Sequence, residues 1–558
     1  MSAEEQSAVA QLLLHCEEPG GTAPPYVVQS DTYREARGPF FGESLPVRTQ
    51  PIPYDARGDE IFVVSDLHIA AGRTRAGVYK GTENFFADDS FLRFVNHIHE
   101  KAAGGGALLV INGDIFDFLR ITEHPGSVRR ARLSKRLKRA LKLEPIQPPA
   151  PPQPRHVADE YNEWSLELAK VGIAMTPARL EASISAHERK IGLGTTDFKT
   201  IYRLIRIRHG HPEFIQALGF WMERGHRLMV LKGNHDLELY WPAVRNYMRL
   251  MIAEDIVARN PAQTVADVLR DVVLPNITFV DDSVLIDGDF YVEHGHRYDK
   301  FTMVLGSPVL TKTPTQINIP FGSFFNRYLI NRIELYYPFL DNVRPSGNVL
   351  PMLMKANFPL GLKVLFQHIP LLLRVLFTNP RYVWFMLHKV FWFALVLGVP
   401  VAYLVLAFAH APIIDTITNA VSSSKILTTI VGQLKPVAML FLSYVLARVV
   451  AWFQLEEPDS LSKYARIRFE GTDYRLMTMG HTHNPGEYVF TNGQRFYNTG
   501  TWIPVIEAST ASVREDRTYT FLHLVRDGQG KLQPLPDGLQ RWNDDAVRAD
   551  MQVLLERK

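Results

Sequence analysis

Three short apolar runs, each followed at once by polar side chains, constrain the fold of this chain most strongly. They are residues 60–65 (EIFVVS), 107–111 (ALLVI) and 227–231 (RLMVL), which precede Asp66-Leu67-His68, Asn112-Gly113-Asp114 and Gly233-Asn234-His235-Asp236. Short runs rich in β-branched residues are typical of buried strands. Helical patterns lie between them, as in βαβ units. We therefore predict an α/β fold that gathers these polar side chains at one edge of a sheet.

Further strand patterns follow in two groups separated by a long interruption. They are residues 277–280, 283–286 and 290–293 before it, and 474–479, 486–490 and 495–498 after it. Asn492-Gly493, between the last two, predicts a hairpin turn. The core is thus discontinuous along the chain. The predicted parts are an N-terminal segment, 1–55, expected to be flexible; core parts 56–121, 212–301 and 471–530; helical insertions 122–211 and 302–470; and a C-terminal tail or helix, 531–558.

Composition excludes several classes of protein. Lys and Arg number 61 against 58 Asp and Glu, a net charge of +3, with 46% hydrophobic and 21% charged residues. These values exclude a disordered polyelectrolyte and a uniformly basic nucleic-acid coat. The single cysteine, Cys16, cannot form an intramolecular disulfide, which favours a reducing compartment. The N-terminus begins acidic and does not resemble a secretory signal, so we expect the core to stay in the cytoplasm.

The first insertion contains a basic run and then a proline-rich stretch. Residues 127–143 hold eight Lys or Arg and no acidic residue, and their leucines recur at helical spacing. Residues 145–154 are proline-rich and predicted to be extended and stiff. A solvated helix face docked on the core and a helix on an anionic lipid surface explain the basic run equally well. Nucleic acid is the least favoured partner.

The second insertion contains the most apolar sequence of the chain. Residues 390–409 are 20 residues without a charge, long enough to cross a hydrocarbon core of about 30 Å. Residues 426–447 form a second candidate span. We predict a transmembrane hairpin of these two spans, and the alternative is a buried or membrane-surface helical bundle. Residues 358–377 are apolar but interrupted by charges, which fits a segment in the membrane plane.

The predicted hairpin also indicates the side of the membrane. Polar motifs on both sides of the insertion must meet in one site, so the chain must cross an even number of times. Three basic residues precede the first span and four end or follow the second, whereas the loop between them has only Lys425. The positive-inside rule then places the core at the cytoplasmic face of the membrane.

Five polar blocks follow predicted strands in order. They are Asp66-Leu67-His68, Gly113-Asp114-Ile115-Phe116-Asp117, Gly233-Asn234-His235-Asp236, His294-Gly295-His296 and Gly480-His481-Thr482-His483. Carboxylates, imidazoles and a carboxamide suit manganese, iron or zinc. Two ions roughly 3.5–4 Å apart can share a carboxylate, hold a phosphoryl group and lower the pKa of a bridging water. Each block alone is a weak signal, but the ordered set predicts a site that hydrolyses phosphoesters.

The blocks resemble the calcineurin-like metallophosphoesterase superfamily, whose pattern is D-x-H, G-D-x-x-D, G-N-H-D/E, a separate H and G-H-x-H. The resemblance implies a four-layer α/β/β/α sandwich with two divalent ions, manganese first and iron or zinc as alternatives. It implies two sets of ligands, Asp66, His68 and His483 for one ion and Asn234, His294 and His481 for the other, with Asp114 as the bridge between the ions.

The resemblance also assigns roles beside the ions. His235 would contact the phosphoryl group and help the leaving group depart, and Asp236 would orient His235. Asp117 would fix a ligand imidazole. His296 is either a substrate contact or a polar loop residue, and Arg120 is a further candidate substrate contact.

Within the superfamily, the block Asp-Ile-Phe-Asp-Phe, the helical insertion and the His-Gly block most resemble the bacterial UDP-2,3-diacylglucosamine hydrolase branch, which cleaves a pyrophosphate in a membrane-bound lipid A precursor. The implied function is a dinuclear metal phosphohydrolase in which a metal-bridging hydroxide attacks phosphorus. Its expected substrate is a lipid-linked phosphoester or pyrophosphate at the cytoplasmic face of the inner membrane. Compact members lack the second insertion, which leaves other phospholipids, isoprenoid pyrophosphates and nucleotide-lipids open. The alternatives are a membrane-tethered phosphatase or phosphodiesterase for soluble substrates and a non-catalytic metal-binding membrane scaffold.

Overall fold

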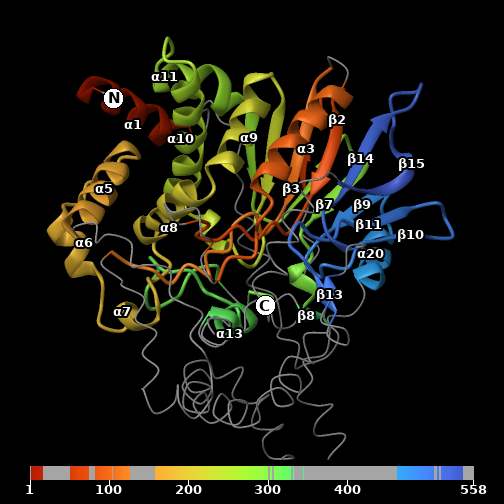
Figure 1. Cartoon of the computed structure of the whole chain (residues 1–558). Helices are drawn as coiled ribbons and strands as arrows, with labels where there is room; N and C mark the ends of the chain where they lie inside the picture. Colours follow the sequence, from red (N-terminus) through yellow and green to blue (C-terminus); the bar gives the residue numbers. More distant parts are fainter. Residues whose placement is uncertain are drawn as a thin grey trace, which may run out of the picture. The chain divides into compact units, whose positions relative to one another are not determined.

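A computed structural model of the chain (Figure 1) describes residues 2–16, 51–73, 79, 82–102, 105–125, 157–299, 302–304, 307–327, 331, 343–344, 461–507, 512–513 and 517–543. The predicted spans 390–409 and 426–447 lie outside these residues, as do residues 127–143, 145–154 and 358–377. Among the helices in the described ranges, none is both long enough and apolar enough to cross a membrane. Met1–Val343 with Pro458–Lys558 form one compact unit, and Arg344–Glu457 form another.

Two six-stranded sheets form the centre of the first unit, which has the predicted α/β fold. One sheet has the order β15 (Leu532–Arg541), β14 (Thr520–Arg526), β2 (Glu60–Val64), β3 (Ala107–Asn112), β4 (Arg227–Leu231) and β5 (Ile277–Val280). The other has the order β1 (Ile52–Tyr54), β6 (Ser283–Ile286), β7 (Phe290–Glu293), β9 (Leu476–Met479), β11 (Arg495–Asn498) and β10 (Gly486–Val489). A three-stranded sheet has the order β13 (Ser512–Val513), β12 (Ile506–Glu507) and β8 (Val343–Arg344).

The predicted strands appear where their apolar runs place them. Strands β2, β3, β4 and β5 run parallel, and every residue of β3, β4 and β5 is buried. Burial on both faces explains their continuous apolar sequences, because parallel strands in α/β folds are covered on both sides. Strands β10 and β11 pair antiparallel around Asn492-Gly493, which confirms the predicted hairpin.

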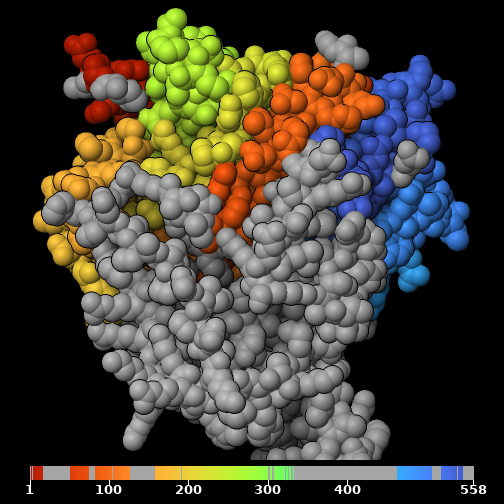
Figure 2. Space-filling model, viewed as in Figure 1, coloured from red at the N-terminus to blue at the C-terminus, as the bar shows by residue number. Residues whose placement is uncertain are grey.

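The helices of the described residues lie between strands along the chain, except α1, which precedes β1. They are α1 (Ala3–His15), α3 (Asp88–Lys101), α5 (Val157–Lys170), α6 (Pro177–Ser183), α7 (Glu188–Ile191), α8 (Asp197–Gly210), α9 (Pro212–Glu223), η1 (Leu237–Tyr240), α10 (Pro242–Arg259), α11 (Val265–Val268), η2 (Leu269–Val273), α12 (Leu274–Asn276), η3 (His296–Tyr298), α13 (Phe321–Phe325) and α20 (Leu461–Phe469). Helix α3 buries Phe91, Phe94, Val95 and Ile98, a spacing that makes one apolar face. Helix α9 packs against α3 and α10, and these helices lie on one face in the space-filling view (Figure 2).

Among the described residues, apolar clusters fill the spaces between the helices and the sheets of the first unit. The largest joins the helices to one face of the parallel strands, through residues such as Phe94 and Leu109. A second cluster lies between the two sheets and joins Val110 to Val292 and Tyr497. The third packs α20 against the other sheet, where Phe469 meets the cluster around Met479. Burial of these apolar surfaces is the main favourable term for the fold.

Two sequence predictions at the ends of the chain are wrong for the residues that the structure describes. The expected flexible segment 1–55 contains α1, whose Val9 and Leu13 are fully buried, and β1, which pairs with β6. Val9 and Leu13 belong to the largest apolar cluster, and the Ser2 side chain caps α1 by accepting the Glu5 N–H. The expected tail or helix 531–558 begins with strand β15, which pairs with β14. Its prolines hid the strand pattern, but proline is tolerated on an edge strand.

Candidate metal centre

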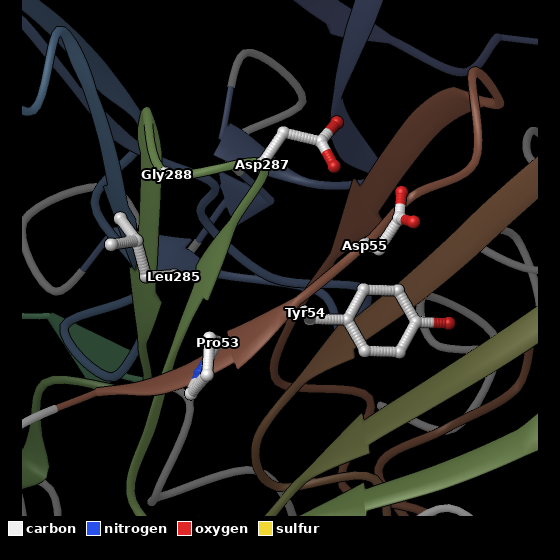
Figure 3. A pocket seen from close by; sticks show the side chains of 6 residues that line it. All are labelled: Pro53, Tyr54, Asp55, Leu285, Asp287 and Gly288. Atoms are coloured by element: carbon white, nitrogen blue, oxygen red, sulfur yellow. The ribbon is translucent and has the colours of Figure 1, made fainter.

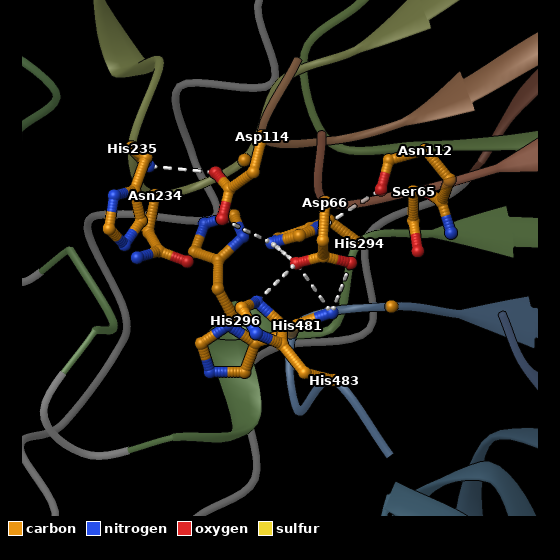
Figure 4. Close-up of polar contacts among 12 residues, drawn as sticks. Ser65, Asp66, Asn112, Asp114, Asn234, His235, His294, His296, His481 and His483 are labelled. Carbon is orange, nitrogen blue, oxygen red and sulfur yellow. Dashed lines mark hydrogen bonds and ion pairs between the residues drawn. The ribbon is translucent and has the colours of Figure 1, made fainter. Parts of the chain in front are cut away.

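The two sheets deliver the predicted ligands from the ends of their strands (Figure 4). Asp66 and His68 follow β2, Asp114 follows β3, and Asn234 follows β4. From the other sheet, His294 follows β7, and His481 and His483 follow β9. The loops after β2 and β3 stay paired, since the N–H groups of Asp66 and His68 donate to the carbonyls of Gly113 and Asp114. All seven predicted ligands therefore meet where the strands end.

The first predicted ligand set is assembled as expected. Ligand atoms of Asp66, His68 and His483 all lie within 4.8 Å of one another. His68 Nε2 is 3.0 Å from His483 Nε2, and Asp66 Oδ1 is 3.7 Å and 3.3 Å from these two nitrogens. The three side chains are almost fully buried. Two imidazole nitrogens and a carboxylate oxygen thus face a common point.

The second set is assembled around Asp114. Ligand atoms of Asp114, His294 and His481 also lie within 4.8 Å of one another. Asp114 Oδ2 is 3.2 Å from His294 Nε2 and 3.8 Å from His68 Nε2. Because its carboxylate reaches a histidine of each set, Asp114 has the position expected of a bridging ligand.

The polar atoms of this centre fit divalent ions. Asp114 Oδ2, Asn234 Oδ1 and His294 Nε2 are buried without a hydrogen-bond partner among the described residues. Nδ1–H of His294 donates to the carbonyl of Asn112 at 2.8 Å, which leaves Nε2, 3.2 Å from Asp114 Oδ2, as the nitrogen that would bind an ion. Leaving a buried polar group unsatisfied costs about 1–3 kcal/mol. Oxygen and imidazole donors suit manganese, iron or zinc and would satisfy all three atoms.

The backbone at the centre is strained. Five of the eight described non-glycine residues with positive φ are predicted ligands: Asp66 (54°), His68 (50°), Asp114 (52°), His481 (67°) and His483 (54°). Such conformations are uncommon outside glycine, and each costs of order 1–3 kcal/mol. Because these conformations are concentrated here, we infer that packing of the surrounding structure holds the loops in them and so directs these side chains toward one another.

Glycines of the motifs allow the loops to approach one another. Gly113 has φ +82°, and a Cβ there would lie 2.2 Å from Nδ1 of His294. A Cβ on Gly233 would lie 2.1 Å from an oxygen of Asp114, and one on Gly480 would lie 2.3 Å from an oxygen of Asp66. The glycines are therefore needed for space directly behind the ligands.

Asp117, and not Asp236, contacts the ring of His235. Asp117 Oδ2 is 3.0 Å from His235 Nδ1 and 3.6 Å from His68 Nδ1. The carboxylate of Asp236 instead accepts backbone N–H groups of Gly233 at 2.7 Å and Ile115 at 2.9 Å. The prediction that Asp236 orients His235 is wrong: its carboxylate faces away into two loop backbones and ties them together.

The two candidate substrate contacts lie differently. Arg120 is 1% exposed, and its Nε–H donates to Asp117 Oδ2 at 3.0 Å while NH1 donates to the carbonyl of Thr82. Arg120 therefore holds the carboxylate of Asp117 in place. His296 is 2% exposed, with its ring centroid 5.4 Å from that of His294, and both its nitrogens lack hydrogen-bond partners in the described part of the chain. A bound ligand could satisfy them.

Electrostatics couple these groups strongly. Burial opposes charging of His68, but Asp117, Asp66 and Asp114 raise its pKa to about 10. Burial likewise opposes charging of His294, but Asp114 and Asp66 raise its pKa to about 9. Burial acts against ionisation of Asp66 and Asp114, yet the surrounding imidazoles hold the pKa of both carboxyls below the ordinary value.

Burial also shifts the pKa values of two further groups, Asp236 and His296. Burial, together with the charge of Asp114, raises the pKa of Asp236 to about 7, although the Gly233 N–H partly offsets this. Burial and then the neighbouring His294 and His481 lower the pKa of His296 well below its ordinary value. The centre thus combines ionised carboxylates with protonated imidazole rings. When a metal ion binds, such rings can release their protons and become ligands.

Several contacts that hold the predicted ligands were not predicted from the sequence. The Thr501 hydroxyl donates to the Asp66 carbonyl at 2.7 Å, and the Ser323 hydroxyl donates to the Asn234 carbonyl at 3.1 Å. The carbonyl of Asn112 orients His294, and Asp299 lies 3.3 Å from Nε2 of His481. Threonine and serine in loops carry no motif of their own, so only the folded contacts reveal them.

A separate open pocket lies at the edge of the second sheet (Figure 3). Its volume is about 480 Å³, and it is lined by Pro53, Tyr54, Asp55, Leu285, Asp287 and Gly288. The residues that line it come from β1, β6 and the turns after them, and include none of the predicted ligands.

No model of a protein family matches this chain, and no curated protein is significantly similar to it.

Proposed function

We propose that this protein is a dinuclear metal-dependent phosphohydrolase. The observation that carries the proposal is Asp114, whose buried carboxylate lies between a histidine of each ligand set and has an oxygen without a hydrogen-bond partner in the described ranges. Two ligand sets sharing one carboxylate are the arrangement expected for a pair of ions that act on one phosphoryl group. The layers described above fit the four-layer α/β/β/α sandwich implied by the resemblance to calcineurin-like metallophosphoesterases.

Bound divalent ions, manganese first and iron or zinc as alternatives, would supply Lewis acidity and a nucleophilic hydroxide at neutral pH. The first would be held by Asp66, His68 and His483, and the second by Asn234, His294 and His481, with Asp114 bridging. The hydrolysis forms a bond from water oxygen to phosphorus and breaks the bond to the leaving-group oxygen.

The residues of the chain have separate tasks in this reaction. His235 lies beside Asp114, since the backbone N–H of His235 donates to Asp114 Oδ1 at 2.8 Å. The ring of His235 contacts Asp117. We assign His235 to contact the phosphoryl group and to pass a proton to the departing oxygen. Asp117 and Arg120 hold the ring in place, and burial of the centre strengthens these charge contacts.

The proposed substrate is a lipid-linked phosphoester or pyrophosphate at the cytoplasmic face of the inner membrane. This part of the proposal rests on the apolar residues 390–409 and 426–447 and the basic residues 127–143 in the sequence. Acyl chains would enter apolar surface, and phosphates would meet Arg and Lys.

The test compares a nucleotide-linked diacyl lipid with its water-soluble head group, using detergent-solubilised full chain and manganese. We expect cleavage of the lipid by the wild type and at least ~100-fold less by His235→Ala, the low end of the contribution of a general acid or base. Equal cleavage of lipid and head group would favour a membrane-tethered enzyme for soluble substrates. Absence of metal-dependent cleavage of either would contradict the proposal and favour a metal-binding scaffold.

A further inference from the structure

Nε2 of the predicted ligand His481 faces two acceptors that no sequence motif indicated. It lies 3.3 Å from Asp299 Oδ2 and 3.3 Å from Thr302 Oγ1. The side chains of His481 and Asp299 are only 8% and 12% exposed, so water competes little for this contact. The Thr302 hydroxyl in turn donates to the carbonyl of His296 at 3.0 Å, which holds this loop against the centre.

The contact determines which nitrogen of His481 is left for a metal ion. A neutral imidazole has one N–H donor and one lone pair, and an ionised carboxylate can only accept. Nε2–H therefore donates to Asp299, and Nδ1 keeps the lone pair. We propose that Asp299, supported by Thr302, is the positioning residue that holds His481 as an Nδ1 ligand of the second ion. This inference rests on the proposed function.

Other ligand histidines of the centre have matching partners. Nδ1–H of His294 donates to the Asn112 carbonyl, and Nδ1 of His68 lies 3.6 Å from Asp117 Oδ2. In each of these histidines the nitrogen remote from the ligand set faces an oxygen of the chain. Such partners fix the tautomer and the ring orientation, and their loss typically costs 10–100-fold in metal affinity. Asp299 completes this pattern for His481.

The position of Asp299 in the sequence adds a consequence. It lies three residues before Thr302, where the predicted second insertion begins, and His481 lies beyond the end of that insertion. The contact therefore joins the two sides of the insertion at a metal ligand. A change in this loop would act on the second ion and leave the first set, Asp66 with His68 and His483, in place.

The test measures manganese binding to the metal-free full chain by calorimetry, with electron paramagnetic resonance to detect coupled ion pairs. Asp299→Ala should weaken the affinity for the second equivalent of manganese about 10–100-fold and leave the affinity for the first equivalent unchanged. With one equivalent of manganese added, the electron paramagnetic resonance spectrum of this variant should show an isolated ion in place of a coupled pair. Asp299→Asn, which keeps an acceptor without the charge, should fall between, and Asp271→Asn, an exposed carboxylate, should behave as wild type.

Thr302→Val provides a second variant in case Asp299→Ala does not fold, and it should weaken the second equivalent by a smaller factor. Two tight equivalents and a coupled spectrum in every variant would overturn the role of Asp299 and leave the proposed function standing. Failure of the wild type to bind a second ion would instead overturn the dinuclear proposal itself.

Discussion

Nδ1 of His235 and Nε of Arg120 meet the same carboxylate oxygen, Oδ2 of Asp117, at 3.0 Å each. Asp117 and Arg120 are buried. Burial alone would raise the pKa of Asp117, but His235, His68 and Arg120 hold it well below its ordinary value. The ionised carboxylate thus links the ring proposed to contact the phosphoryl group to the predicted ligand His68.

Asp117→Asn is expected to lower kcat and, because it leaves the buried Arg120 guanidinium without its carboxylate, also to lower the stability of the fold. The amide keeps the shape of the side chain but loses the charge that holds the His235 and His68 rings, and loss of such partners costs about 10–100-fold in activity. Steady-state kinetics with manganese measure the effect. Asp236→Asn is the matched variant: it weakens the backbone contacts of Gly233 and Ile115, so its main effect should be a lower thermal midpoint. Equal kcat losses at equal stability in the two variants would contradict this division of roles.

Arg120→Met tests whether Arg120 positions Asp117 or binds substrate. Since its guanidinium is buried against Asp117 and the Thr82 carbonyl, we expect kcat to fall while KM stays within about twofold, because a group that does not touch substrate contributes no uniform binding. Removal of one partner of a buried ion pair should also destabilise the fold by about 3–5 kcal/mol. Chemical denaturation and initial rates measure both effects, and a raised KM with unchanged kcat would identify Arg120 as a substrate contact.

Gly480→Ala is expected to disrupt the first ligand set. The new Cβ would lie 2.3 Å from Oδ2 of Asp66, so Asp66 must move, and its position is fixed by the N–H of His481 at 3.0 Å. We expect loss of at least one bound manganese, measured by elemental analysis after gel filtration. Gly528→Ala is the control, because a Cβ there meets nothing within 4 Å. Full metal content in Gly480→Ala would show that the loop adapts.

His211 makes the stability of the fold depend on pH. Its nitrogens lie 2.9 Å from Asp88 Oδ1 and 3.2 Å from Glu83 Oε2. Burial opposes its charge, but these carboxylates raise the pKa of His211 from 6.5 to about 10. A raised pKa means that the protonated ring stabilises the fold fully below about pH 6.5, and that this contribution is lost as the pH rises through about 10.

Glu83 also makes the stability of the fold depend on pH, but its stabilising contribution is lost as the pH falls. Burial would raise its pKa, but His211 and backbone N–H groups lower it below 4.5, so its contribution is lost as the pH falls through the folded value. We expect His211→Gln to cost about 3–5 kcal/mol near neutral pH and to remove most of the loss of stability between pH 6.5 and 10. Urea unfolding at several pH values measures this, and an unchanged alkaline slope in the variant would contradict it.

Much of the core was readable from the sequence, because its strands carry strong local signals. The predicted runs 277–280, 283–286 and 290–293 match β5, β6 and β7 residue for residue, since each is short, apolar and bounded by turn residues. The clustering of the predicted ligands was readable for a related reason: each polar block follows directly on such a strand, so its place in space follows from the topology of the sheet.

The remaining features depend on contacts that no local pattern encodes. Helix α1 packs against α5 and α11, far along the chain, so its burial could not be read from residues 3–15. Strand β15 was obscured by Pro534 and Pro536, which its edge position tolerates. The resemblance implied that Asp236 orients His235, but the Asp236 carboxylate turns to the backbone of Gly233 and Ile115, contacts that only the folded loops create.

We propose that two ions sharing Asp114 act together on a phosphoester. The most direct measurement is the rate of hydrolysis of a nucleotide-linked diacyl lipid by metal-free full chain as manganese is added in known equivalents. We predict a rate that reaches its plateau only when two equivalents are bound, and no metal-dependent rate for Asp114→Ala. A wild type that hydrolyses nothing at any manganese level, or an Asp114→Ala variant as active as wild type, would contradict the account.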